Sequence, residues 1–168
     1  MPRSRAFRRH LPHWHLDGAT YFVTWCLHHE QPCLGPHERT LVCDALRHFD
    51  GTRYDLHASV VMDDHVHVVA RPLYRRPLSG ILQNWKSYTA HRLTADFERR
   101  APVWQDESYD RVVRDERELG KVLEYVRDNP RRRWPGVDRY PWIVIPTDGS
   151  GGLSKDRPGG LSYDRASP

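Results

Sequence analysis

The stretch of this sequence that most constrains its fold is VVMDDHVHVVARP, residues 60–72. β-Branched residues on both sides of an acidic pair predict two strands joined by a tight turn at Asp63 and Asp64. Side chains two residues apart on a strand point the same way, so His65 and His67 share one face of the second strand. The alternate residues of that strand are all apolar. We therefore expect them to pack on helices and to leave both imidazoles on the opposite face.

Two neutral imidazoles at this spacing can hold one divalent cation if another part of the chain supplies a further ligand. The alternative is a pair of incidental strand histidines, because the chain has 11 histidines and short motifs often arise by chance. Which interpretation holds depends on what the rest of the chain brings to the same face.

The remaining sequence predicts one domain in a chain of 168 residues. Strands are expected at 20–28, 54–62, 65–72 and 109–113. Helices are expected at 38–49, at 79–97 with Ser79 as its cap, and at 115–129, where Pro130 ends the helix. This order is that of an α+β, ferredoxin-like fold, with a central antiparallel sheet, helices on one face and an additional C-terminal helix. Residues 1–19 form a basic arm, 20–142 the domain, and 143–168 a tail containing two GGLS repeats.

Charge and cysteine content indicate the kind of partner and compartment. Lys and Arg number 26 against 22 Asp and Glu, for a net charge of +4, and the excess is clustered. Such clusters suit a nucleic-acid backbone, although a solvated basic surface is the alternative. The 3 cysteines have no CxxC spacing, and no apolar run is long enough to span a membrane. We expect a cytoplasmic, nucleoid-associated protein. The candidate DNA-contacting residues are Arg5, Arg8, Arg9, Trp14, Arg75, Arg76, Lys86, Arg92, Arg131, Arg132 and Arg133.

Tyr125 lies on the last predicted helix but off its apolar stripe, and Asn129 lies one turn further on. This pair suits a nucleophile beside a metal ligand. A boundary tyrosine with Asn129 as the helix C-cap is the alternative. Tyrosine attack on a phosphodiester yields a phosphotyrosine ester of similar energy, so such a site can cut and rejoin DNA without ATP. A metal on His65 and His67 would offset the weak nucleophilicity of a phenol. Tyr88 is the competing nucleophile, interpreted as a packing or DNA-contacting residue.

Several motifs in the chain, taken in order, resemble a known family. An HVH strand followed by a helix with a tyrosine resembles the HUH single-strand endonuclease superfamily. The segments YFVTWCLH, VVMDDHVHVVARP, VWQDESYDRVVRDEREL, EYVRDNP and YPW are similar to those of the REP-associated tyrosine transposases, relatives of the single-tyrosine insertion-sequence transposases. The resemblance covers residues 11–142.

The resemblance implies that His65 and His67 bind Mg²⁺ or Mn²⁺, that Tyr125 is the nucleophile and that Asn129 is the third ligand or a polar group beside the metal. It also implies recognition of palindromic repeats folded as hairpins, with cleavage in the flanking single-stranded DNA. The chain departs from the family in the acidic pair before His65, interpreted as the turn, and in the arginines at 131–133, which suit DNA contact. Related enzymes complete their site across a dimer; for this chain a monomer is favoured.

Two other functions remain open from the sequence. The first is a DNA-binding or regulatory protein that recognises hairpins without catalysis. The second is a zinc hydrolase, which would need more ligands at closed spacing and a placed general base.

Overall fold

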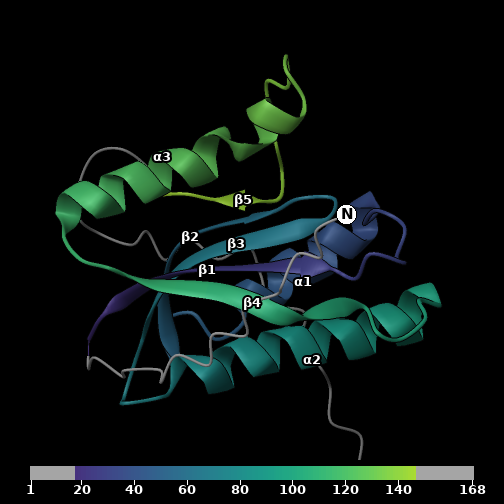
Figure 1. Cartoon of the computed structure of the whole chain (residues 1–168), viewed down its shortest axis with the longest axis horizontal. Helices are drawn as coiled ribbons and strands as arrows, with labels where there is room; N and C mark the ends of the chain where they lie inside the picture. Colours follow the sequence, from purple (N-terminus) through teal and green to yellow (C-terminus); the bar gives the residue numbers. More distant parts are fainter. Residues whose placement is uncertain (1–17, 147–168) are drawn as a thin grey trace, which may run out of the picture.

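The computed structural model describes residues 18–146, which form one antiparallel sheet of 5 strands with three helices (Figure 1). The order across the sheet is β4-β1-β3-β2-β5. The α+β, ferredoxin-like fold predicted from the sequence is confirmed. No helix in the described part of the chain is long and apolar enough to cross a membrane. The element bounds are β1 Thr20–Leu27, α1 Pro36–Arg47, β2 Tyr54–Val61, β3 His65–Pro72, α2 Leu78–Phe97, β4 Trp104–Val113, α3 Glu116–Arg133 and β5 Ile143–Val144.

The sheet separates two hydrophobic cores. On one face, α1 and α2 pack against the strands, and on the other face α3 does (Figure 1). Val66 and Val68 of β3 belong to the core under α1 and α2, as the alternation in the sequence predicts. Val69 belongs to the core under α3. Since His65 and His67 share the face of Val69, both imidazoles lie on the α3 side of the sheet.

The strand pairing places β3 between β1 and β2. Antiparallel pairing with β1 sets Thr24 opposite His67 and Cys26 opposite His65, and pairing with β2 sets Val60 opposite His67. The turn between β2 and β3 contains the acidic pair, as expected. His67 therefore has neighbouring strands on both sides, and its side chain is only 5% exposed.

Three element boundaries differ from the sequence predictions. The last long strand is β4, which begins at Trp104 rather than at residue 109. Ser79 is not the cap of α2, because the helix begins at Leu78 and Pro77 occupies the N-cap position. The folded region extends past residue 142, since β5 pairs with the edge of β2. A strand of two residues carries no alternation that a sequence pattern could detect.

The prediction that Pro130 ends the last helix is wrong. Asp115 caps α3 by accepting a hydrogen bond from the Glu118 amide at 2.7 Å, and the helix then continues through Pro130 to Arg133. Proline removes one backbone donor and crowds the preceding turn, which is costly in a helix interior. Here it lies in the last turn and is itself buried, so packing offsets the lost hydrogen bond. Asn129 is therefore an interior residue of α3 and not its C-cap.

Candidate metal and tyrosine site

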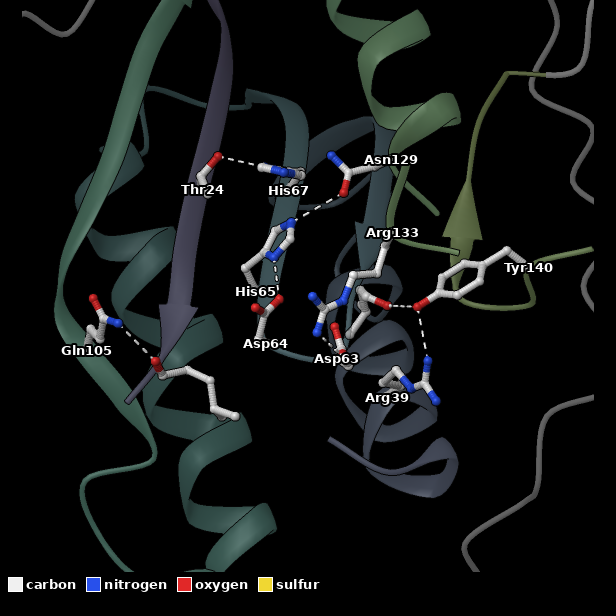
Figure 2. Close-up of polar contacts among 12 residues, drawn as sticks. Thr24, Arg39, Asp63, Asp64, His65, His67, Gln105, Asn129, Arg133 and Tyr140 are labelled. Atoms are coloured by element: carbon white, nitrogen blue, oxygen red, sulfur yellow. Dashed lines mark hydrogen bonds and ion pairs between the residues drawn. The ribbon is translucent and has the colours of Figure 1, made fainter. Parts of the chain in front are cut away.

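His67 is held by β1 and by an aromatic ring. Its Nδ1 atom is hydrogen bonded to the Thr24 hydroxyl at 2.7 Å (Figure 2), and the Phe22 ring stacks on the imidazole with centroids 5.4 Å apart. Burial, and secondarily the neighbouring His65, lower the pKa of His67 to about 3, so its imidazole is neutral at physiological pH. In the tautomer whose Nδ1 donates to Thr24, Nε2 carries a lone pair. That Nε2 atom is buried and has no hydrogen-bond partner among the described residues.

His65 is oriented by the turn residue before it. The Asp64 carboxylate lies 2.6 Å from its Nδ1, so in the neutral imidazole Nδ1 is the donor and Nε2 carries the lone pair (Figure 2). The Oδ1 atom of Asn129 lies 3.3 Å from that Nε2. Oxygen and nitrogen lone pairs at this distance repel each other unless a proton or a cation lies between them.

The Nε2 atoms of His65 and His67 and the Oδ1 atom of Asn129 therefore gather on the α3 side of β3. The imidazole rings have centroids 4.6 Å apart, and Asn129 is 7% exposed. Two imidazole nitrogens suit a divalent transition metal, the amide oxygen also suits Mn²⁺ or Mg²⁺, and the three together leave positions open for substrate. Within residues 18–146 no group of three His, Cys, Asp or Glu side chains could hold a metal ion, so such a site depends on the amide. The residues present fit an open divalent site and not a closed zinc site.

Tyr125 reaches the same region from α3. Its ring is half-buried and packs edge-on against His67, with centroids 5.1 Å apart, and against Phe22 at 5.9 Å. The helical spacing seen in the sequence places Asn129 on the same face one turn later. Tyr125, Asn129 and the two histidines thus meet within one chain. Tyr88 does not take part, because α2 packs on the opposite face of the sheet and Tyr88 is 51% exposed there.

The end of α3 is tied to the turn that precedes His65. Arg133 forms an ion pair with Asp63 at 3.0 Å (Figure 2). Burial alone would raise the pKa of the Asp63 carboxyl, but the Arg133 guanidinium outweighs it and lowers that pKa. After the helix, the Tyr140 hydroxyl donates to the Val61 carbonyl at 2.8 Å and accepts from Arg39 at 3.1 Å. These contacts fix the position of α3, which carries Tyr125 and Asn129, relative to β3, which carries the two histidines.

The structure disperses the predicted DNA-contacting residues. Those at 131–133 are exposed at the end of α3, next to the site. Arg75 and Arg76 are exposed in the loop after β3, at the opposite end of that strand from His65. On α2, across the sheet from the site, Lys86 donates to the carbonyls of Gln105 and Asp106, and Arg92 pairs with Asp96. The remaining predicted contacts lie outside the described residues and are Arg5, Arg8, Arg9 and Trp14.

Sequence reasoning missed Phe22 and Thr24 as parts of the site. The alternation of β1 does place both on one strand face, but the pattern does not reveal which strand lies beside them. Only the register, which sets Thr24 opposite His67, brings them to the imidazole. Asp64 was interpreted as a turn residue. It does form the turn, and it also orients His65.

Comparisons with known proteins agree with this fold. The family model described as "Transposase IS200 like" matches residues 16–129. No curated protein matches the chain. One similar solved structure is that of a REP-associated tyrosine transposase bound to a REP hairpin, 18% identical, covering 80% of this chain and 75% of that chain with a TM-score of 0.61. Another is a candidate transposase from Deinococcus radiodurans, 16% identical, covering 76% of this chain and 97% of that chain with a TM-score of 0.51. Because the family model matches more than half of the sequence, the chain belongs to the IS200-like transposase family.

Proposed function

We propose that this protein cuts and rejoins single-stranded DNA beside repeat hairpins, using Tyr125 as the nucleophile and a divalent metal, Mg²⁺ or Mn²⁺. Membership of the transposase family supports a DNA-processing role. The REP hairpin bound to the similar transposase supports hairpin DNA as the partner. A monomer is proposed as the functional unit, because all four side chains of the site belong to one chain.

The observation that carries the proposal is the buried Nε2 atom of His67. It has no partner among the described residues, and it belongs to the imidazole against which the Tyr125 ring packs. A buried nitrogen without a hydrogen bond costs roughly 1–3 kcal/mol. A metal ligand needs such a lone pair and a neutral imidazole, and the lowered pKa of His67 keeps this imidazole neutral at physiological pH.

His65, His67 and Asn129 would hold the metal, which when bound polarises the scissile phosphate and offsets its charge. The Tyr125 hydroxyl loses its proton to solvent, and its oxygen attacks phosphorus. A new P–O bond forms to Tyr125 as a P–O bond of the DNA breaks, and the departing DNA oxygen takes up a proton. Attack on the phosphotyrosine by the hydroxyl of another DNA end reverses these steps and joins the strands.

The packing around Tyr125 contributes to this reaction by positioning. Phe22 and His67 contact the ring edge-on, so the phenol can occupy only a narrow range of orientations beside the phosphate. Because folding already fixes the orientation of the phenol, less conformational freedom is lost when the phenol attacks the phosphate. The Arg133–Asp63 ion pair serves the same end, because it holds the last turn of the helix that carries the nucleophile.

The experiment that tests the proposal is denaturing gel electrophoresis of the protein with end-labelled single-stranded hairpin DNA, in Mn²⁺ or in EDTA. We expect a covalent protein–DNA band that needs metal, persists in Tyr88→Phe and is absent in Tyr125→Phe. Removing the Tyr125 oxygen removes the atom that bonds phosphorus. An adduct that survives in Tyr125→Phe would refute the assigned nucleophile. Binding of hairpin DNA in a native gel without any adduct would instead indicate the non-catalytic, regulatory function.

A second prediction concerns the hydrogen bond that orients His67. Thr24→Val keeps the side-chain shape but removes the hydroxyl, so the Nδ1 atom of His67 loses the hydrogen bond that sets its tautomer and helps to orient its ring. Loss of a residue that orients a ligand typically weakens metal affinity by about 10–100-fold, and we expect a loss in this range for Mn²⁺. Electron paramagnetic resonance of free Mn²⁺ during a titration measures it without DNA. Thr24→Ser retains the hydroxyl and should bind nearly as the wild type does. Equal affinity of the valine and wild-type proteins would exclude this role.

A further inference from the structure

The three arginines that follow Pro130 have three different surroundings. The continuation of α3 past Pro130 places all of them on its last turn. Arg133 forms an ion pair with Asp63. The guanidinium of Arg132 instead lies over the ring of Tyr125, with its Cζ atom 5.0 Å from the ring centroid. No carboxylate within the described part of the chain pairs with Arg132 in a salt bridge.

Helical geometry explains why only one of the three reaches the tyrosine. Residues four and seven positions apart return to nearly the same face of a helix, so Tyr125, Asn129 and Arg132 form one row. Relative to Tyr125, Arg131 lies about 120° to one side and Arg133 about 80° to the other. Had the helix ended at Pro130, as the sequence suggested, this row would have ended at Asn129.

The chemistry proposed for Tyr125 calls for a cation at this position. In phosphoryl transfer, negative charge is spread over the non-bridging oxygens of the phosphate in the transition state. A guanidinium offers donors in a planar fork that matches two such oxygens. The positive charge of Arg132 is held beside the nucleophile by contact with its ring, and its donors are not used by another side chain in the described residues.

We propose that Arg132 is a catalytic residue that binds the phosphate attacked by Tyr125 and stabilises its charge in the transition state. The inference rests on the proposed function and deepens it. The two histidine ligands approach the phosphate from β3, and Arg132 approaches it from the end of α3, beyond Asn129. Arg132 forms and breaks no covalent bond. After attack, its guanidinium pairs with the phosphotyrosine ester and so stabilises the intermediate that must wait for the second DNA end.

The test compares single-turnover rates of adduct formation at saturating hairpin DNA in Mn²⁺. Loss of one transition-state donor typically costs about 10²–10³-fold in rate, which is the decrease we expect for Arg132→Gln. Arg132→Lys keeps the positive charge but not the planar guanidinium with its paired donors. Its rate of adduct formation should lie between the rates of Arg132→Gln and the wild type. The matched control is Arg117→Gln, which removes the same charge from an exposed site on the same helix, about 22 Å away along the axis. Its rate should stay within about threefold of the wild type.

A second measurement asks whether the arginine contacts that particular phosphate. In the Tyr125→Phe background, hairpin DNA with a neutral methylphosphonate at the cleaved position is compared with ordinary DNA for binding. The methylphosphonate should weaken binding when Arg132 is present and have little effect in Arg132→Gln, because the two changes remove the same contact. The inference would be overturned if methylphosphonate weakened binding equally with Arg132 and with Arg132→Gln, or if the adduct formed in Arg132→Gln at a rate near that of the wild type. Either result would leave the assignment of Tyr125 as nucleophile unaffected. A wild-type protein that forms no adduct overturns both proposals.

Discussion

Replacing Arg99 with methionine is expected to lower the free energy of unfolding by about 3–5 kcal/mol. Arg99 is 8% exposed, and its guanidinium forms a two-pronged ion pair with Glu38 of α1. It also donates to the carbonyls of Pro32 at 2.8 Å and Cys33 at 3.0 Å. One side chain thus joins the chain after α2 to α1 and to the loop before it. Its removal leaves the buried Glu38 carboxylate with the Gly35 amide but without the guanidinium, and it leaves two carbonyls without this donor.

The matched control is Arg100→Met, because Arg100 is adjacent and its side chain is exposed. This variant should change stability by no more than about 0.5 kcal/mol. The double variant Arg99→Met with Glu38→Leu removes the stranded charge as well, and it should be more stable than Arg99→Met alone. Urea denaturation followed by tryptophan fluorescence measures all of these differences. A loss below about 1 kcal/mol in Arg99→Met would show that water replaces the guanidinium at little cost.

The ion pair between Glu38 and Arg99 also makes the free energy of unfolding depend on pH. Burial alone would raise the pKa of Glu38, but hydrogen bonds from Arg99 and the Gly35 amide outweigh it and lower that pKa. A carboxyl with a lower pKa in the folded state stabilises the fold above its unfolded-state pKa, near 4.5. This contribution is lost as the pH falls through the folded-state value. Glu38→Gln should therefore flatten the decline in stability between neutral pH and acid.

Periodicity accounts for what the sequence predicted correctly. Alternation along 65–72 separated the two imidazoles from Val66 and Val68, and the structure places these sets on opposite faces of the sheet. The 3.6-residue period of α3 placed Tyr125 and Asn129 in one row, which the fold then directed toward β3. Both patterns involve residues that are close together in the sequence, so a single sequence reveals them without knowledge of long-range contacts.

What the sequence did not predict depends on contacts between distant residues or on competing energies. Thr24 and His67 are 43 residues apart, and only the strand register joins them. Glu38 and Arg99 are 61 residues apart and resemble ordinary surface charges until the fold buries them. At Pro130 a correct local rule was outweighed by packing. That error also concealed the position of Arg132, because the rule placed the end of the helix before the arginines.

Replacing His67 is expected to abolish metal binding and adduct formation together. His67→Gln removes the buried imidazole nitrogen but keeps a polar side chain of similar size. An orienting residue is typically worth about 10–100-fold in metal affinity, so loss of a ligand should exceed about 100-fold for Mn²⁺. We expect the adduct to disappear at metal concentrations that saturate the wild type. Titration of Mn²⁺ and the denaturing gel measure the two effects separately.

His91→Gln is the matched control for this change. His91 is an exposed histidine of α2, on the other side of the sheet, so its variant should bind Mn²⁺ and form adduct as the wild type does. Hairpin binding in EDTA should persist in His67→Gln, because under the proposed function basic side chains, and not the metal, bind the hairpin. Unfolding of both variants in urea shows whether the buried substitution preserves the fold. A folded His67→Gln protein with wild-type Mn²⁺ affinity would mean that the unshared lone pair of His67 is not a metal ligand, and the metal-assisted mechanism would have to be abandoned.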